Sequence, residues 1–149
     1  MPENPRPTIA LGADHAGYPL KTRIKQALVE AAYPVLDCGT NNEDSVDYPD
    51  FSQCVTEAVA GGAARFGVLI CGTGIGMSIA ANRHPSIRCA LAHDATTARL
   101  GRAHNDANVL ALGARTTGED EAMDALRAFL DTDFAGGRHT SRVAKLGAS

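Results

Sequence analysis

Short apolar runs alternate with longer segments of helical period along nearly the whole chain, and this alternation constrains the fold more than any other feature. Runs rich in β-branched residues predict strands over residues 8–13, 35–38, 66–71, 87–92 and 109–112. Strands that alternate with helices are typical of an α/β domain with a mainly parallel sheet. The 149 residues suit one such domain, and we expect a single domain over 1–149.

Prolines, glycines and one N-cap residue set the expected helix boundaries. The first helix opens at Gly17 and Pro19 and stops before Pro34. Further helices are expected between Pro49 and Gly61, from a glycine loop to His84, from Asp94 through Arg102, over 119–130, and over a basic tail, 138–145. The polar loop at 39–50 is longer than usual connections, which suggests a function.

Composition excludes several classes of partner. Fourteen Lys and Arg against 17 Asp and Glu give a net charge of -3. The overall charge therefore does not attract the chain to nucleic acid or to an anionic membrane. No apolar run approaches the roughly 18 residues of a membrane span. The first residues lack the apolar stretch of a signal peptide, and we expect a cytoplasmic protein with a flexible N-terminus over 1–7.

The four cysteines, at positions 38, 54, 71 and 89, show no zinc-like spacing. In a chain of this length we expect reduced thiols rather than a disulfide framework. We expect no metal site.

Polar residues follow two of the predicted strands. Asp14 and His15 come after the first strand, and Cys71 ends the third, just before a glycine loop. A later helix ends in His104 and Asn105. Ligands of open parallel sheets bind at the carboxyl ends of the strands, and we expect all these residues to converge at one rim.

The loop after the third strand alternates glycines at positions 72, 74 and 76 before a helix. Its backbone N–H groups can point at an anion without obstruction. A dinucleotide fingerprint needs glycine where Met77 stands, and no Gly-Lys-Ser/Thr follows for a nucleotide P-loop. The alternative is that the glycines only permit a tight turn.

Several side chains have both a chemical and a structural interpretation. Cys71 precedes a helix N-terminus, which lowers a thiol pKa from about 8.5 and favours a base or nucleophile, but its position equally suits a core cysteine. His104 suits a general acid or base, or a helix cap. Arg138 and Arg142, four residues apart, suit one phosphate or a solvated tail. Tyr48 either lines a pocket or packs beside it.

Six ordered motifs resemble the type B ribose-5-phosphate isomerases, a family that also contains allose-, galactose- and tetrulose-phosphate isomerases. The motifs are Gly12-Ala-Asp-His-Ala-Gly17, Asp47-Tyr-Pro49, Cys71-Gly-Thr-Gly-Ile-Gly76, Ala80-Ala-Asn82, His104-Asn-Asp-Ala-Asn108 and Gly136-Gly-Arg-His139. The resemblance covers nearly the whole chain. It implies a three-layer α/β/α Rossmann-like sandwich with a five-stranded, mainly parallel sheet. It also implies no cofactor, and a homodimer or dimer of dimers whose active sites contain residues of both chains.

The resemblance also implies roles for individual residues in aldose–ketose isomerisation through a cis-enediolate. Cys71 moves the proton between carbons, Thr73 assists transfer between oxygens, His104 reaches across the interface to open the sugar ring, and Asp14 hydrogen-bonds the sugar. Phosphate is bound by His15, Arg115, Arg138 and Arg142, the 72–76 loop stabilises the oxyanion, and the sugar pocket is lined by Tyr48, Asn82 and Asn105.

One branch of the family uses a glutamate as base at the position of Met77, so only Cys71 is available here. We favour ribose 5-phosphate as substrate, with allose 6-phosphate or an erythrulose phosphate as the alternative. A phosphate-binding module without turnover is a further alternative. Cys71→Ala separates the two classes, because only an enzyme needs the thiol.

Overall fold

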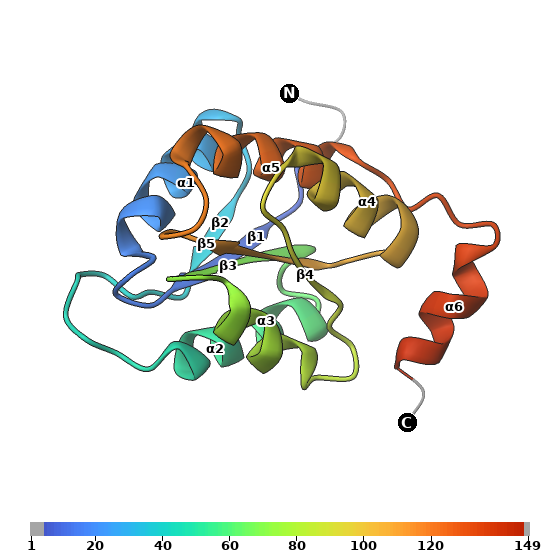
Figure 1. Cartoon of the computed structure of the whole chain (residues 1–149), viewed down its shortest axis with the longest axis horizontal. Helices are drawn as coiled ribbons and strands as arrows, with labels where there is room; N and C mark the ends of the chain where they lie inside the picture. Colours follow the sequence, from blue (N-terminus) through green and yellow to red (C-terminus); the bar gives the residue numbers. More distant parts are fainter. Residues whose placement is uncertain (1–4, 148–149) are drawn as a thin grey trace.

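A single five-stranded sheet runs through the middle of the protein (Figure 1). The computed structural model describes residues 5–147. Its strands are β1 (Ile9–Ala13), β2 (Val35–Asp37), β3 (Phe66–Cys71), β4 (Cys89–Leu91) and β5 (Val109–Gly113). The order is β2-β1-β3-β5-β4, and every pairing is parallel. The predicted parallel α/β sheet is confirmed.

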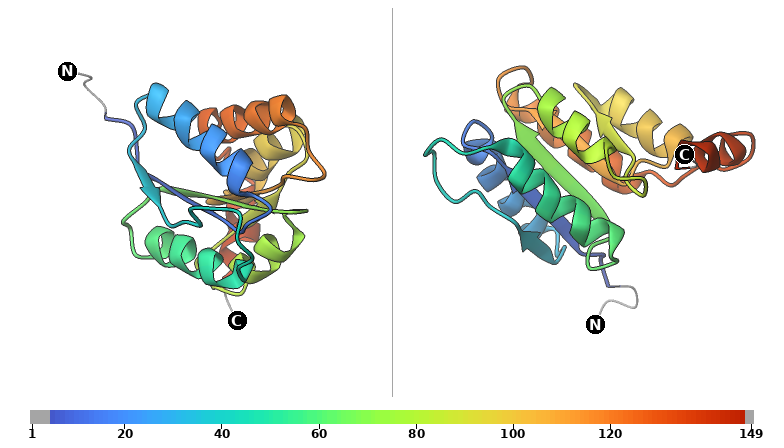
Figure 2. Two further views of the ribbon diagram at one scale, coloured as in Figure 1. Left: turned by 90° about the vertical axis from the view of Figure 1, so that its left-hand side faces the viewer. Right: turned by 90° about the horizontal axis from the view of Figure 1, so that it is seen from below.

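Helices cover both faces of the sheet (Figure 2). One face carries α1 (Tyr18–Glu30), α4 (Ala95–Asn105) and α5 (Glu119–Asp131), and the other carries α2 (Tyr48–Ala60) and α3 (Ile75–Asn82). This is the three-layer sandwich that the resemblance implies. No helix within residues 5–147 is both long and apolar enough to cross a membrane.

The three central strands are buried along their whole length, which explains why they are apolar without alternation. Alternate residues supply two cores. Leu11 and Ile70 pack beneath α1 and α5, with Phe129, and Leu69 packs on the opposite face against Val55 of α2. Full burial of one such side chain contributes roughly 1.5–3 kcal/mol. The cores therefore hold the central strands, and the loops at their ends, in place.

Strand β4 is shorter than the sequence pattern predicts. Residues 87 and 88 lie outside it because other groups take their N–H donors. Ile87 donates to the carbonyl of His84 at 3.0 Å, and Arg88 donates to Oδ1 of Asn108 at 2.8 Å. The apolar composition predicted the strand correctly, but it did not predict the turn at residues 87 and 88.

The basic tail forms the expected helix, α6 (His139–Leu146). None of its residues is buried. In Figure 1 it stands beside the end of α4, at the end of the molecule where the strands begin. The predicted flexible N-terminus falls mostly on residues 1–4, which lie outside the described residues. Arg6 is described, and it donates to the Tyr33 hydroxyl at 2.9 Å.

The expectation of four reduced thiols is wrong for two of them. Cys38 and Cys54 form a disulfide, with Cα atoms 6.0 Å apart. Cys38 follows β2, and Cys54 lies within α2, so the long loop at residues 38–47 folds back and brings them together. A spacing of 16 residues in the sequence matches no disulfide motif, and only this tertiary contact reveals the pair.

Reduction of the disulfide is expected to lower the free energy of unfolding by about 3 kcal/mol, since a bridge closing a loop of this length removes comparable entropy from the unfolded chain. Melting temperatures measured with and without a thiol reductant test this. The wild type should melt lower when reduced, and Cys54→Ser should melt low in both conditions. Cys89→Ser, which alters a free cysteine, is the control and should keep the reductant dependence. Equal melting temperatures of the wild type in both conditions would contradict the bridge.

Candidate active site

Asp14 lies immediately after β1, where a close backbone contact holds it. Its carboxylate Oδ1 accepts the Gly17 N–H at 3.0 Å, and only 7% of Asp14 is exposed. A Cβ on Gly17 would lie 2.5 Å from the carbonyl oxygen of Ile70, so the start of α1 presses directly on β3. Glycine at 17 is therefore needed for packing, and the packing fixes the Asp14 carboxylate.

His15 is half-buried beside the long loop. Its Nδ1 accepts the N–H of Val46 at 3.2 Å. A neutral imidazole that accepts at Nδ1 carries its proton on Nε2. The long loop thus contacts His15 and orients its ring.

Cys71 ends β3 and is 5% exposed. Its Sγ accepts the N–H of Gly74 at 3.2 Å, within the glycine loop. Gly74 has a φ of +77°, and a Cβ there would lie 2.6 Å from Leu91 Cδ1. Only glycine can take this left-handed turn in this space, and the turn aims a backbone dipole at the thiol sulfur. The sulfur is both buried and directed at the loop.

Other predicted residues surround the same loop. The Thr73 hydroxyl accepts the N–H of Ile75 at 3.2 Å. A Cβ on Gly72 would lie 3.3 Å from Nη1 of Arg115. The Tyr48 ring packs on Gly76, where a Cβ would be 2.7 Å from it. We call these residues the Cys71 cluster: Asp14, His15, Tyr48, Cys71, Gly72, Thr73, Gly74, Gly76 and Arg115.

The remaining predicted residues do not join this cluster within one chain. Helix α4 runs from the end of β4 back to the beginning of β5. His104 and Asn105 therefore lie at the amino ends of the strands, opposite the Cys71 cluster (Figure 1). Helix α6 lies at this end too, with Arg138 just before it and Arg142 on it. A five-residue strand is about 17 Å long. The expectation of one rim is therefore wrong for a single chain, because a helix that follows a strand returns to the other end.

We call this second group the His104 cluster: His104, Asn105, Arg138, His139 and Arg142. The rings of His104 and His139 are stacked, with centroids 4.4 Å apart and planes 17° from parallel. Sequence reasoning missed this contact, although both histidines stand in the motifs that carry the resemblance.

Asp106 ends α4 in a left-handed conformation, with φ of +48°. Its carboxylate accepts from Arg102 Nη1 at 2.9 Å and from Arg88 Nη2 at 3.3 Å. Arg102 is 3% exposed and also donates to the carbonyls of Ala107 and Thr132. This network fixes the end of the helix that carries the His104 cluster. This network could not be predicted from the sequence, because Arg88 lies 18 residues from Asp106, and Thr132 lies 30 residues from Arg102.

Asn82 is expected in the sugar pocket, but the structure gives its amide a structural contact. Its Oδ1 accepts the N–H of Cys89 at 2.8 Å, and its Nδ2 donates to the Cys89 carbonyl at 3.1 Å. Asn82, Asn105 and Leu146 line a pocket of about 380 Å³ beside β4.

Burial, together with Cys71, raises the pKa of the Cys89 thiol to about 12. Cys89 thus stays protonated near neutral pH and is a poor base.

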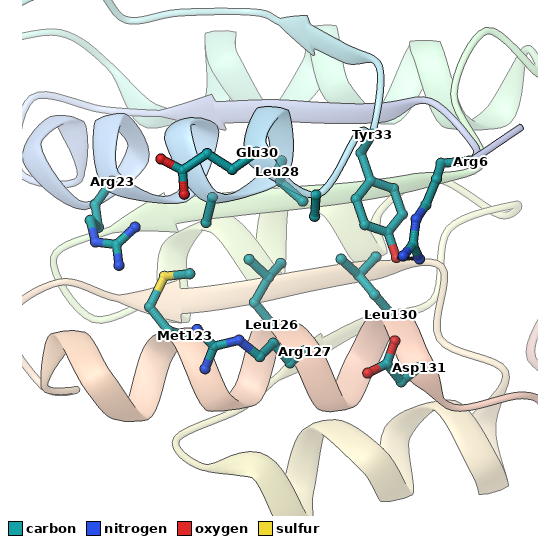
Figure 3. Close-up of a pocket in the computed structure, with 12 residues that line it drawn as sticks. Arg6, Arg23, Leu28, Glu30, Tyr33, Met123, Leu126, Arg127, Leu130 and Asp131 are labelled. Atoms are coloured by element: carbon teal, nitrogen blue, oxygen red, sulfur yellow. Dashed lines mark hydrogen bonds between the residues drawn. The ribbon is translucent and has the colours of Figure 1, made fainter. Parts of the chain in front are cut away.

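A groove of about 410 Å³ lies between α1 and α5, away from both clusters (Figure 3). Leu28, Met123, Leu126 and Leu130 form its apolar floor, and arginines, Glu30 and Asp131 surround it. It contains none of the predicted site residues. Within residues 5–147, no group of three or more His, Cys, Asp or Glu side chains is placed to hold a metal ion.

Known proteins resemble this chain over almost its whole length. The family described as Ribose/Galactose Isomerase matches residues 9–146. Ribose-5-phosphate isomerase B of Escherichia coli is 45% identical over 140 residues, 94% of each chain. D-erythrulose-4-phosphate isomerase of Pectobacterium atrosepticum is 39% identical, over 94% of this chain and 93% of that one.

The fold is similar to solved structures as well. The structure of ribose-5-phosphate isomerase B of Clostridium thermocellum superposes with a TM-score of 0.93 at 50% identity, covering 94% of this chain and 95% of that one. The protein therefore belongs to the ribose/galactose isomerase family, and it is an enzyme that interconverts the aldose and ketose forms of a sugar phosphate.

Proposed function

We propose that the enzyme interconverts ribose 5-phosphate and ribulose 5-phosphate through a cis-enediolate, with Cys71 as the base. The observation that carries the proposal is the buried Cys71 sulfur, held by the Gly74 N–H at the carboxyl end of β3. The name of the Escherichia coli relative supports the choice of sugar.

In this mechanism Cys71 removes the proton from C2 of the open-chain aldose and returns it to C1. Negative charge then develops on the carbonyl oxygen, and the N–H groups of the 72–76 loop stabilise it. One well-placed donor of this kind contributes roughly 2.7–4 kcal/mol. Thr73 assists the proton transfer between O1 and O2. The enzyme gains no net proton and the electron pair stays within the substrate, so the reaction balances without an oxidant or reductant.

A complete site in this proposal takes the Cys71 cluster from one chain and the His104 cluster from a second copy. Within one chain the two clusters lie at opposite ends of the strands. Helix α6 buries no residue against its own chain, which leaves it free to meet a partner. Phosphate is then held by His15 and Arg115 of one chain and by Arg138 and Arg142 of the other. The enzyme is accordingly a homodimer or a dimer of such dimers.

The proposed substrate also bears on location. Sugar phosphates are charged and do not cross membranes unaided, so the proposal places the enzyme in the cytoplasm. Disulfides are uncommon there.

A second substrate is favoured by one specific observation, the relative named D-erythrulose-4-phosphate isomerase. The same proton transfer serves a four-carbon sugar phosphate, because the reacting carbons are C1 and C2 in both. Relative kcat/KM values for the two aldose phosphates decide between them.

Cys71→Ala is expected to reduce kcat about 10²–10⁴-fold, since a positioned base contributes that much. Affinity for the sugar phosphate should persist, because the phosphate contacts are unchanged. Ribulose 5-phosphate formation and ligand affinity by calorimetry are the measurements, with Cys89→Ala as the matched control that keeps activity. Full turnover by Cys71→Ala would exclude the thiol. A wild type that binds sugar phosphates without turnover would favour a binding module.

Replacing both Arg138 and Arg142 with alanine is expected to raise KM at least about tenfold, because each charge-assisted hydrogen bond to phosphate is worth roughly 1.5–3 kcal/mol. Lys145→Ala removes a positive charge from the same helix and should leave KM within about twofold. Steady-state kinetics at fixed ionic strength provide the comparison. An unchanged KM in the double variant would show that the tail is a solvated surface.

A further inference from the structure

His139 faces the proposed ring-opening acid, His104, and the mechanism above gives it no task. The two rings are stacked at 4.4 Å, with a 17° angle between their planes. Backbone contacts enforce the stack. Gly136 and Gly137 both have positive φ, and the N–H of Ala135 donates to the Ala103 carbonyl at 3.0 Å. The turn therefore brings the first residue of α6 back onto the end of α4.

The charges around His139 are predominantly positive. His104 stacks on it from α4, and Arg138 and Arg142 lie one and three residues from it along the chain. The Asp106 carboxylate, two residues after His104 in the sequence, pairs with Arg102 and Arg88. Desolvation, followed by the charges of His104 and the two arginines, lowers the pKa of His139. Two protonated rings in face-to-face contact would repel each other, so protonation of one opposes protonation of the other.

We propose that His139 is a positioning residue for His104, which holds the His104 ring by stacking and opposes protonation of both rings at once. The inference rests on the proposed function and on the role in opening the furanose ring that the resemblance implies for His104. In that step the C1–O4 bond breaks, O4 takes the proton of His104, and the O1 hydroxyl loses its proton to water. Stacking uses the ring faces and leaves the ring nitrogens at the edges, where a substrate oxygen can reach them.

The charge coupling is testable without any substrate. In an NMR pH titration of the full-length protein, the two rings should titrate in separate steps. His104→Phe keeps an aromatic stack and removes the charge, so the midpoint of His139 should rise by about half a pH unit or more. His93→Phe, at the other end of α4, is the control and should leave that midpoint unchanged. An unchanged midpoint in His104→Phe would overturn the coupling.

The positioning role is tested with two sugars. Ribose 5-phosphate forms a furanose ring, whereas D-erythrose 4-phosphate cannot, because its O4 carries the phosphate. His139→Ala should lower kcat/KM for ribose 5-phosphate about tenfold, part of what a general acid supplies. His139→Phe, which keeps the stack, should stay within about threefold. Both variants should lose much less activity on erythrose 4-phosphate than on ribose 5-phosphate, because its conversion needs no ring opening.

The outcomes separate the two proposals. Equal losses on both sugars would indicate a merely structural role and would overturn the assignment of His139. A folded wild type that turns over neither sugar would overturn the proposed function, and the NMR titration would still decide whether the two rings share one proton.

Discussion

The site depends on a close backbone approach at the end of β3. The start of α1 presses on this strand at Gly17, and the left-handed turn at Gly74 folds the following loop over Cys71. A side chain at either glycine would meet other atoms within 2.6 Å or less, so the chain there has little freedom. One rigid turn consequently places a thiol and a backbone N–H 3.2 Å apart. Preorganised donors of this kind need no rearrangement when charge develops.

Parallel α/β topology explains why the second group of residues lies elsewhere. Each crossover helix returns to the end of the sheet where the next strand begins, so the end of α4 lies away from the Cys71 cluster. Residues 102–106 are nevertheless fixed by a buried arginine and an Asp106 carboxylate, and α6 projects beside them. An ordered helix that buries none of its own residues favours a partner surface. The proposed dimer brings the two clusters together in one site, although they lie at opposite ends of the strands within each chain.

Local patterns predicted most of the fold. Apolar runs located all five strands, and Pro19, Asp94 and the paired glycines located helix ends, because these signals act within a few residues. Contacts between distant segments could not be predicted. The Cys38–Cys54 bridge and the His104–His139 stack depend on how two loops fold back, and neither leaves a spacing signature. Motifs predicted the candidate site residues, but only the three-dimensional structure shows at which end of the strands each one lies.

The central claim is that each active site combines the Cys71 cluster of one chain with the His104 cluster of another, and subunit mixing tests it most directly. Cys71→Ala and His104→Ala, each of low activity alone, are mixed in equal amounts under conditions of confirmed subunit exchange. Random pairing makes half of the dimers mixed, and each mixed dimer has one intact site, so about a quarter of the wild-type activity should return. No recovery after complete exchange would contradict the account and place each site within one chain.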